Sequence, residues 1–337
     1  MAMQLLLFCL VILKISSVLA TMPTPFNEPY VGGNGCPLWS DIYQNTCPEA
    51  EAIIFSWVVK AVSEDSRIAA SLLRLHFHDC FVNGCDASVL LDDTEDFVGE
   101  KTAAPNLNSL RGFEVIDAIK SEIELVCPET VSCADILAIV ARDSVVLSGG
   151  PSWDVQMGRR DSLSASREAA NNNIPGPNST VDTLVAKFEN VGLALNDVVA
   201  LSGAHTIGKA RCTTFSSRIQ QSSSDLGSPD VNLDFITSLQ QLCTGPDSGN
   251  NVAQLDLVTP ATFDNQYYVN LLSGEGLLQS DQALVTGNDQ TRQIVETYVE
   301  DPFAFYEDFK NSMLKMGSLG PLTGSDGEIR RNCRIVN

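Results

Sequence analysis

Histidine, positive charge and long apolar runs are all scarce in this 337-residue chain. Only three residues are histidine, and 21 lysines and arginines stand against 42 aspartates and glutamates, for a net charge of −21. So large an acidic excess argues against nucleic acid or an anionic membrane as a binding partner. Two interpretations of the charge stay open: it serves solubility alone, or it keeps the protein away from polyanionic polymers.

The most apolar segment lies at the N-terminus. Residues 5–13 form a short apolar run, and Val18-Leu19-Ala20 follows it, which is the pattern of a cleaved secretory signal over residues 1–20. Neither this run nor any later one is long enough to span a membrane, so we expect a soluble, exported protein. Ten cysteines fit an oxidising compartment, and nine remain once Cys9 leaves with the signal.

Most of the remaining sequence has the spacing of amphipathic helices, and few stretches alternate as strands do. Ser132 is placed to cap a helix that ends at Leu147, before Gly149-Gly150-Pro151. Two further apolar stripes have helical spacing: Phe113, Ile116, Ile119, Ile123 and Val126; Val181, Leu184, Val185, Phe188 and Val191. A third stripe has the same spacing, and we expect its members in the core: Phe303, Tyr306, Phe309 and Met313. The sequence predicts an all-α domain over residues 38–337, after an extension at 21–37 that is a loose arm or is trimmed off.

The segment from Arg74 to Cys80 combines several reactive side chains. On a helix, Arg74, Phe77 and His78 share one face, whereas His76 lies about 200° away from His78. A neighbouring guanidinium keeps an imidazole neutral and able to act as a base. The alternative at this point is a histidine that is simply buried in the core.

A second histidine segment follows at 196–208. We expect a short helix capped by Asn196, then glycines around His205 that let the backbone approach something flat or bulky. Two of the three histidines therefore lie in segments rich in small residues.

These two segments, Arg74 to Ser88 and Leu201 to Gly208, closely resemble the distal and proximal haem motifs of plant secretory (class III) peroxidases. The resemblance covers residues 40–337 and implies an all-α haem peroxidase fold, with one haem b between a distal and a proximal half. Further matches follow in the same order: Asn106, Gly158-Arg159-Arg160-Asp161, Phe263-Asp264-Asn265, Gln279-Ser280-Asp281 and Asn332-Cys333-Arg334.

The resemblance also implies roles for individual residues. His205 resembles the iron ligand, and Asp281 the carboxylate that accepts the other ring N–H of that ligand. His78 would move the peroxide proton while Arg74 stabilises developing negative charge. The remaining roles are those of Phe77, which shields the iron, Asn106, which holds His78 with Glu100 behind it, and Pro175, where aromatic donors bind.

Two calcium ions are implied as well, beside the two histidine segments. The distal set consists of Asp79, Val82, Gly84, Asp86 and Ser88, with Val82 and Gly84 contributing carbonyls. The proximal set consists of Thr206, Asp256, Thr259, Thr262 and Asp264, with Thr262 contributing its carbonyl. Calcium prefers such oxygen ligands, although an acidic chain also forms similar loops without metal.

The family pattern pairs eight cysteines as disulfides and leaves Cys36 over, in the extension. The implied pairs are Cys47–Cys127, Cys80–Cys85, Cys133–Cys333 and Cys212–Cys243. Asn178-Ser179-Thr180 is a glycosylation sequon, a short pattern with many false matches.

By this resemblance we expect an anionic, monomeric peroxidase that reduces hydrogen peroxide to water and oxidises phenolic donors in one-electron steps. Its setting would be cell-wall phenolic polymerisation, defence or peroxide removal, in the apoplast in preference to the vacuole. Two other classes remain as alternatives. One is a zinc hydrolase using His76, His78 and Cys80, which lacks the usual zinc-ligand spacing; the other is a calcium-stapled binding protein without activity.

Overall fold

The computed structural model describes residues 38–95, 97–220 and 231–337. The predicted signal peptide, the extension at 21–37 and Cys36 lie outside the described residues. Within the described ranges, no helix combines the length and the apolar character needed to cross a bilayer.

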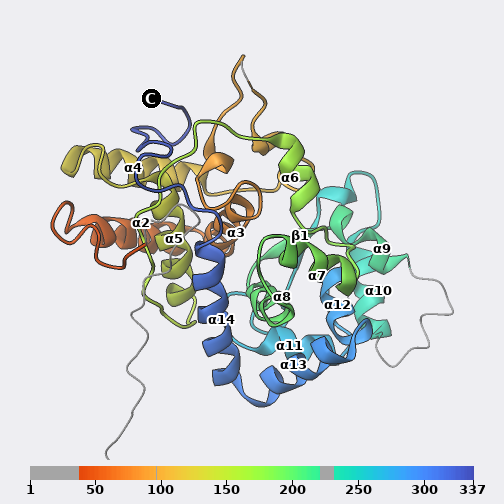
Figure 1. Ribbon diagram of the computed structural model, residues 1–337. Helices are drawn as coiled ribbons and strands as arrows, with labels where there is room; N and C mark the ends of the chain where they lie inside the picture. Colours follow the sequence, from red (N-terminus) through yellow and green to blue (C-terminus); the bar gives the residue numbers. More distant parts are fainter. Residues whose placement is uncertain (1–37, 96, 221–230) are drawn as a thin grey trace, which may run out of the picture. The chain divides into compact units, whose positions relative to one another are not determined.

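Helices form most of the regular structure (Figure 1), and the prediction of an all-α fold is confirmed. The α-helices up to residue 202 are α2 (Ala50–Glu64), α3 (Ile68–Cys80), α4 (Phe113–Val126), α5 (Cys133–Leu147), α6 (Arg167–Asn173), α7 (Val181–Asn190) and α8 (Leu195–Ser202). The later ones are α9 (Ser216–Ile219), α10 (Leu233–Leu242), α11 (Gln266–Leu272), α12 (Gln279–Thr286), α13 (Asp289–Glu300) and α14 (Pro302–Gly317).

Short elements complete the fold. The 3-10 turns are η1 (Ser88–Leu90), η2 (Glu100–Thr102), η3 (Gly203–Thr206), η4 (Cys212–Thr214) and η6 (Ser248–Asn250). Strands β1 (Lys209–Arg211) and β2 (Val252–Gln254) pair antiparallel, with Ala210 opposite Ala253, and form the one sheet of the described ranges.

Local chemistry explains several helix ends. The Ser132 hydroxyl accepts a hydrogen bond from the backbone N–H of Asp135, so α5 begins where the sequence predicted. That helix ends before Gly149, whose φ of 94° lies in the left-handed region that glycine tolerates. Thr180 caps α7 in the same way as Ser132 caps α5.

Two predictions about helices were wrong. Asn196 does not cap α8, because the helix begins at Leu195 and the Asp197 carboxylate accepts the Ala194 N–H at 2.8 Å. Asn196 instead donates to Asp308. In α14, Phe303 is 77% exposed, since it lies in the first turn on the side away from the core.

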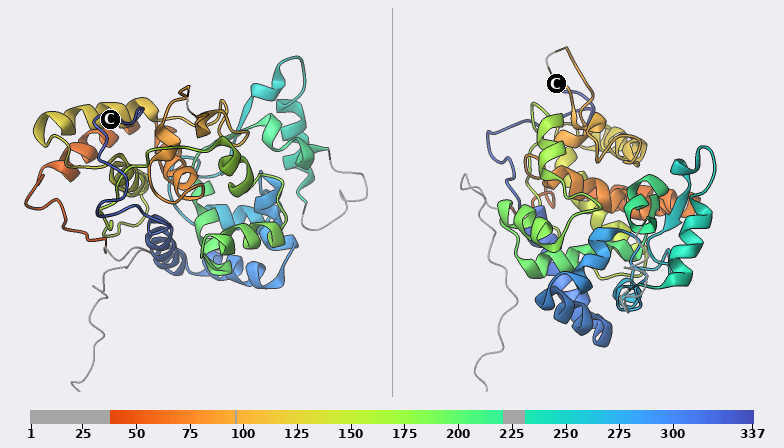
Figure 2. Two further views of the ribbon diagram at one scale, coloured as in Figure 1. Left: turned by 45° about the horizontal axis from the view of Figure 1, so that its top comes forward. Right: turned by 90° about the vertical axis from the view of Figure 1, so that its right-hand side faces the viewer.

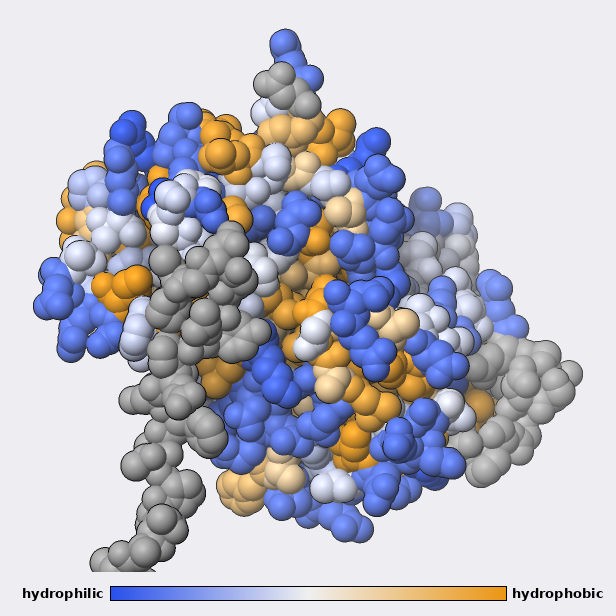
Figure 3. All heavy atoms as spheres, viewed as in Figure 1, coloured by the Kyte–Doolittle hydropathy of each residue, from blue (hydrophilic) through white to orange (hydrophobic). Residues whose placement is uncertain are grey.

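Helix α5 lies at the centre of the helices that precede residue 150. Helices α2, α3 and α4 pack on α5, and nearly every residue of α5 is buried. Among the later helices, α8 contacts α7, α13 and α14 (Figures 1 and 2). Helix α14 also contacts α3 and so joins the later helices to the earlier ones. The face drawn in Figure 3 is largely hydrophilic, as the charge predicts, with hydrophobic residues running through its middle.

Candidate functional site between α3 and η3

One side of α3 is left partly open. Arg67, Ala70, Arg74 and Phe77 recur at helical spacing and are half-buried, whereas most other residues of the helix are buried. These four side chains form a stripe of incompletely buried residues that includes a cation, Arg74, and an aromatic ring, Phe77. The predicted helix is confirmed.

His78 is fixed by Asn106. The Nδ1 atom of His78 lies 2.6 Å from the side-chain oxygen of Asn106, and the Asn106 amide nitrogen donates to the Glu100 carbonyl at 2.9 Å. Because the amide oxygen accepts, the Nδ1 atom of His78 carries the proton, and its Nε2 atom keeps a free lone pair. Glu100 therefore holds Asn106 through its backbone, not through its carboxylate.

Two effects make His78 neutral. Burial lowers its pKa well below the ordinary value, the charge of Arg74 lowers the pKa further, and only the Asn106 hydrogen bond opposes them. The Arg74 guanidinium donates to the Ser109 hydroxyl at 2.8 Å and to the Pro105 carbonyl at 3.0 Å. Burial lowers the pKa of Arg74 to about 10, so it remains a cation at neutral pH.

His205, in η3, is held by a carboxylate. Its Nδ1 atom lies 2.8 Å from the Asp281 carboxylate, which also accepts the Tyr267 hydroxyl at 3.0 Å and the Leu278 N–H at 3.2 Å. The side chain of His205 is 35% exposed and its Nε2 atom is free to bind a metal. Sequence reasoning missed Tyr267, which nothing in the sequence distinguishes from Tyr268.

The two histidine segments adjoin each other. Helix α3 contacts η3, and a Cβ on Gly208 would lie 2.9 Å from the Cβ of Ala70, so only glycine permits this approach. The η3 side presents further half-buried residues, Leu201 and Ala204. A free imidazole nitrogen, incompletely buried apolar side chains and a cation, all on adjoining segments, fit a haem, which needs a ligand to its iron and mostly apolar surroundings.

The predicted distal oxygen ligands converge beside α3. Asp79 and Asp86 are both buried, and burial together with their mutual repulsion raises the pKa of Asp79 well above its usual range. The Ser88 hydroxyl is buried without a hydrogen-bond partner among the described residues, as is one carboxylate oxygen of Glu100. Two crowded carboxylates beside an unpartnered hydroxyl fit a hard cation.

The backbone beside these carboxylates is tightly constrained. Gly84 has a φ of 105°, and a Cβ there would lie 2.4 Å from the Gly320 carbonyl oxygen. The Val82 carbonyl accepts the Asn173 side-chain amide at 3.2 Å.

The predicted proximal ligands form a second such cluster. The Thr206 hydroxyl lies 3.1 Å from Asp256 and 3.2 Å from Asp264, and the Thr259 hydroxyl lies 3.2 and 3.1 Å from the same two carboxylates. Thr262 contacts this cluster through its backbone N–H, which donates to the Thr259 carbonyl. Two carboxylates sharing two hydroxyls again fit calcium, and Thr206 directly follows His205.

Two other predicted residues lie near the end of α6. Pro175 is half-buried between α6 and α7. Asn178 is exposed, and its side-chain oxygen accepts the Ser217 hydroxyl at 2.7 Å.

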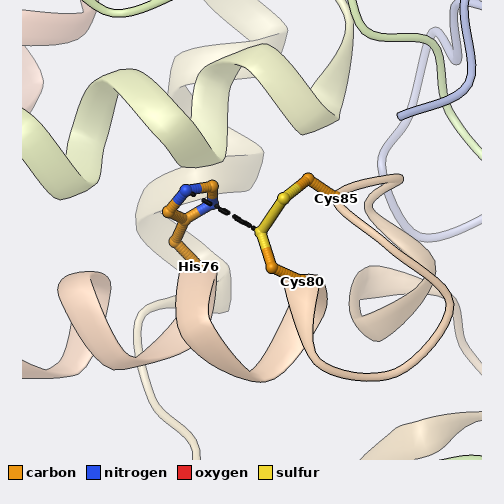
Figure 4. A group of neighbouring side chains, drawn as sticks. All are labelled: His76, Cys80 and Cys85. Atoms are coloured by element: carbon orange, nitrogen blue, oxygen red, sulfur yellow. Dashed lines mark hydrogen bonds between the residues drawn. A yellow bond between two sulfur atoms is a disulfide. The ribbon is translucent and has the colours of Figure 1, made fainter. Parts of the chain in front are cut away.

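His76 belongs to a different cluster, with the Cys80–Cys85 disulfide (Figure 4). Its ring nitrogens lie 3.6 and 3.8 Å from the Cys80 sulfur, and burial plus the charge of Arg159 lowers its pKa to about 3. A cysteine in a disulfide cannot bind zinc as a thiolate, and His78 is committed to Asn106. These contacts therefore argue against a zinc hydrolase that uses His76, His78 and Cys80 as ligands.

All four implied disulfides are present. Cys47–Cys127, Cys80–Cys85, Cys133–Cys333 and Cys212–Cys243 link residues 80, 5, 200 and 31 positions apart. The pair Cys133–Cys333 ties the start of α5 to the C-terminal segment, and so closes a loop over most of the domain.

Comparison with known proteins gives one consistent result. Residues 54–301 match the family model described as peroxidase. The chain is 62% identical to Peroxidase 40 of Arabidopsis thaliana over 334 residues, covering 95% of this chain and 94% of that one. It is 51% identical to Peroxidase 15 of Arabidopsis thaliana (97% of each chain) and 54% identical to Peroxidase 4 of Vitis vinifera (91% and 94%).

Proposed function

The chain belongs to the class III peroxidases of plants and uses hydrogen peroxide to oxidise small-molecule donors; from this premise we propose that the space between α3 and η3 is its active site. The observation that carries the proposal is the pairing of two histidines on adjoining segments. Each has its Nδ1 atom fixed by a partner and its Nε2 atom free.

His78 acts as the proton carrier. Its neutral Nε2 atom takes a proton from hydrogen peroxide and later returns it to the departing oxygen, so the residue is base and then acid. Asn106 fixes the ring and the tautomer. Arg74, held by Ser109 and Pro105, places a fixed positive charge where negative charge develops.

His205 and Asp281 hold the haem. The Nε2 atom of His205 would bind the iron, and the Asp281 carboxylate makes the imidazole a stronger donor. Haem, when bound, supplies the redox chemistry that couples peroxide reduction to donor oxidation. Phe77, on the same stripe of α3 as Arg74, would shield the iron of the bound haem, and aromatic donors would bind near Pro175.

Two calcium ions brace these residues. The distal cluster lies immediately after His78 in sequence and the proximal cluster includes Thr206, so each ion would stiffen the segment that carries one histidine. The crowded carboxylates of Asp79 with Asp86, and of Asp256 with Asp264, support this assignment.

The donors are small phenols, and the enzyme works as a secreted, glycosylated monomer in the cell wall. Four disulfides support an oxidising compartment. The net charge of −21 favours neutral or cationic donors over polyanions. An exposed Asn178 is accessible for glycosylation.

Replacing the axial ligand tests the site. His205→Ala should lose tight haem binding and the intense Soret absorption of the purified protein, and added imidazole should restore part of both by entering the vacated position. His76→Gln is the matched control, because that histidine contacts a disulfide and should keep native haem content. Unchanged haem content and turnover in His205→Ala would refute the assignment, and a native protein without haem would support the inactive calcium-stapled alternative.

A further inference from the structure

Two donors share one oxygen atom of Asp281. The His205 Nδ1 atom lies 2.8 Å from Oδ1, and the Tyr267 hydroxyl donates to that same Oδ1 atom at 3.0 Å. Oδ2 accepts only a backbone N–H, from Leu278, among the contacts of the described residues. The Tyr267 ring also meets the His205 ring edge to face, with centroids 6.1 Å apart.

We propose that Tyr267 is a positioning residue that limits how strongly Asp281 draws on the Nδ1 proton of His205, and thereby sets the electron donation of His205 to the haem iron. The inference rests on the proposed function, in which His205 is the axial ligand. Tyr267 touches neither peroxide nor donor in this scheme and acts through Asp281.

The physical basis is competition for one lone-pair region. A carboxylate oxygen that accepts a second hydrogen bond has part of its charge neutralised, so it is a weaker acceptor for the first. With Tyr267 in place, the imidazole keeps more of its Nδ1 proton and is a weaker ligand. Without the phenol hydroxyl, Oδ1 pulls harder on that proton, the ligand gains anionic character, and the ferric state is favoured over the ferrous state.

Burial makes this competition effective. Tyr267 is 1% and Asp281 is 3% exposed, so bulk water does not replace a missing hydroxyl. The phenol is also held in place by α11, whose next residue, Tyr268, is fully buried.

Tyr268 provides a matched control within the same helix. Its hydroxyl donates to the backbone carbonyl of Val199 at 2.9 Å, and the contacts described for it do not include Asp281. The rings of Tyr267 and Tyr268 pack edge to face at 5.0 Å. Removing the Tyr268 hydroxyl deletes its buried contacts with the Val199 and Ala200 carbonyls, at 2.9 and 3.4 Å, from the same aromatic cluster, but only the Tyr267 hydroxyl reaches the carboxylate.

The test compares Tyr267→Phe with Tyr268→Phe in the haem-loaded enzyme. In Tyr267→Phe the iron–histidine stretching frequency of the ferrous form should rise, and the ferric/ferrous potential should become more negative. The expected size is up to about tenfold in the reduction equilibrium, or 59 mV for a one-electron couple. Tyr268→Phe should leave both quantities at their native values. Native values in Tyr267→Phe, or equal shifts in both variants, would overturn the inference.

A substitution that keeps the phenol hydroxyl provides a second test in case Tyr267→Phe fails to fold. Site-specific 3-fluorotyrosine at position 267 strengthens the donor without removing it, so the stretching frequency should fall and the potential should rise. A shift in the same direction as that of Tyr267→Phe would contradict the mechanism. If the native ferrous enzyme shows no iron–histidine band at all, the assignment of His205 fails instead, which separates the two outcomes.

Discussion

The side-chain oxygen of Asn106 accepts a hydrogen bond from the Nδ1–H group of His78 across 2.6 Å. His205 has the same arrangement, but its acceptor is the carboxylate of Asp281 at 2.8 Å. A neutral amide fixes the tautomer of His78 without adding charge, so the ring can take up a proton and release it. A carboxylate adds charge density to His205 and suits it to binding a metal permanently. The difference between the two acceptors thus assigns the two histidines to different tasks.

Removing the proton carrier should slow the reaction with hydrogen peroxide while haem stays bound through His205. His78→Leu is expected to lower the second-order rate constant by at least about 10² to 10⁴, the usual contribution of general acid–base catalysis. This corresponds to roughly 3 to 5 kcal/mol of barrier. Stopped-flow mixing with peroxide measures it, and a near-native rate in this variant would mean that the face of α3 with Arg74 and His78 is not the peroxide site.

A graded variant separates orientation from proton transfer. Asn106→Val keeps His78 but removes its acceptor, and should reduce the same rate constant about fivefold, since one hydrogen bond contributes about 1 kcal/mol. A loss as large as that of His78→Leu would mean that Asn106 does more than orient the ring.

Periodicity and local chemistry predicted the helices well where the signal is short-range. The helical state of the segment from Arg74 to Cys80 and the end of α5 at Leu147 follow from short-range patterns in the sequence, and so does the Ser132 cap. The exposure of Phe303 does not, because Phe303 and Phe305 are equally apolar in sequence. Only packing decides between them: Phe305 stacks on Phe263, which is distant in the chain.

The candidate site shows the same limit. Roles for His78, His205 and Asp281 came from a resemblance, since their contacts join residues 28 and 76 positions apart. No helical pattern relates such residues to each other. Tyr267 could not be predicted at all, because the choice between it and Tyr268 as the partner of Asp281 depends on how α11 is rotated against η3.

The pH dependence of the peroxide reaction should reflect the lowered pKa of His78. The base must be neutral to react, so the rate constant should stay level as the pH falls to 6.5, the ordinary value for imidazole, and decline only below it. Loss of the Arg74 charge should lower the rate at the other extreme, near pH 10. In Asn106→Val the acid limb should move to still lower pH, because the lost hydrogen bond was the one influence raising this pKa. An acid limb centred at or above 6.5 in the native enzyme would contradict the environment described for His78.

Neutralising the proximal carboxylate should act on the iron without disturbing proton transfer. Asp281→Asn replaces a charged acceptor with a neutral one, so His205 becomes a weaker donor and the ferric/ferrous potential should become more positive. A hydrogen bond to a charged group exceeds a neutral one by about 1 to 2 kcal/mol, which is about fivefold to thirtyfold in the reduction equilibrium. Spectroelectrochemical titration measures the shift. The direction is opposite to that expected for Tyr267→Phe, and an unchanged or more negative potential would show that Asp281 does not strengthen the ligand.

Removal of metal tests the two oxygen clusters separately. Prolonged chelation should release close to two calcium ions per chain and lower both activity and thermal stability, because each ion binds the folded state only. At a free calcium concentration 100 times the dissociation constant, each site contributes about 2.7 kcal/mol to the free energy of unfolding. Asp86→Asn should abolish the distal ion and Asp256→Asn the proximal one, leaving one ion per chain in each case.

The control for the two metal-site variants removes a carboxylate charge outside both clusters. Asp182→Asn, which changes an exposed carboxylate in the first turn of α7, should retain both ions and the native melting temperature. Added calcium should restore the chelated enzyme, whereas magnesium should not, because it demands a smaller and more regular set of ligands. The proximal variant should also weaken haem retention, since Thr206 joins that cluster to His205. Metal analysis that finds no calcium in fully active enzyme would overturn both sites at once.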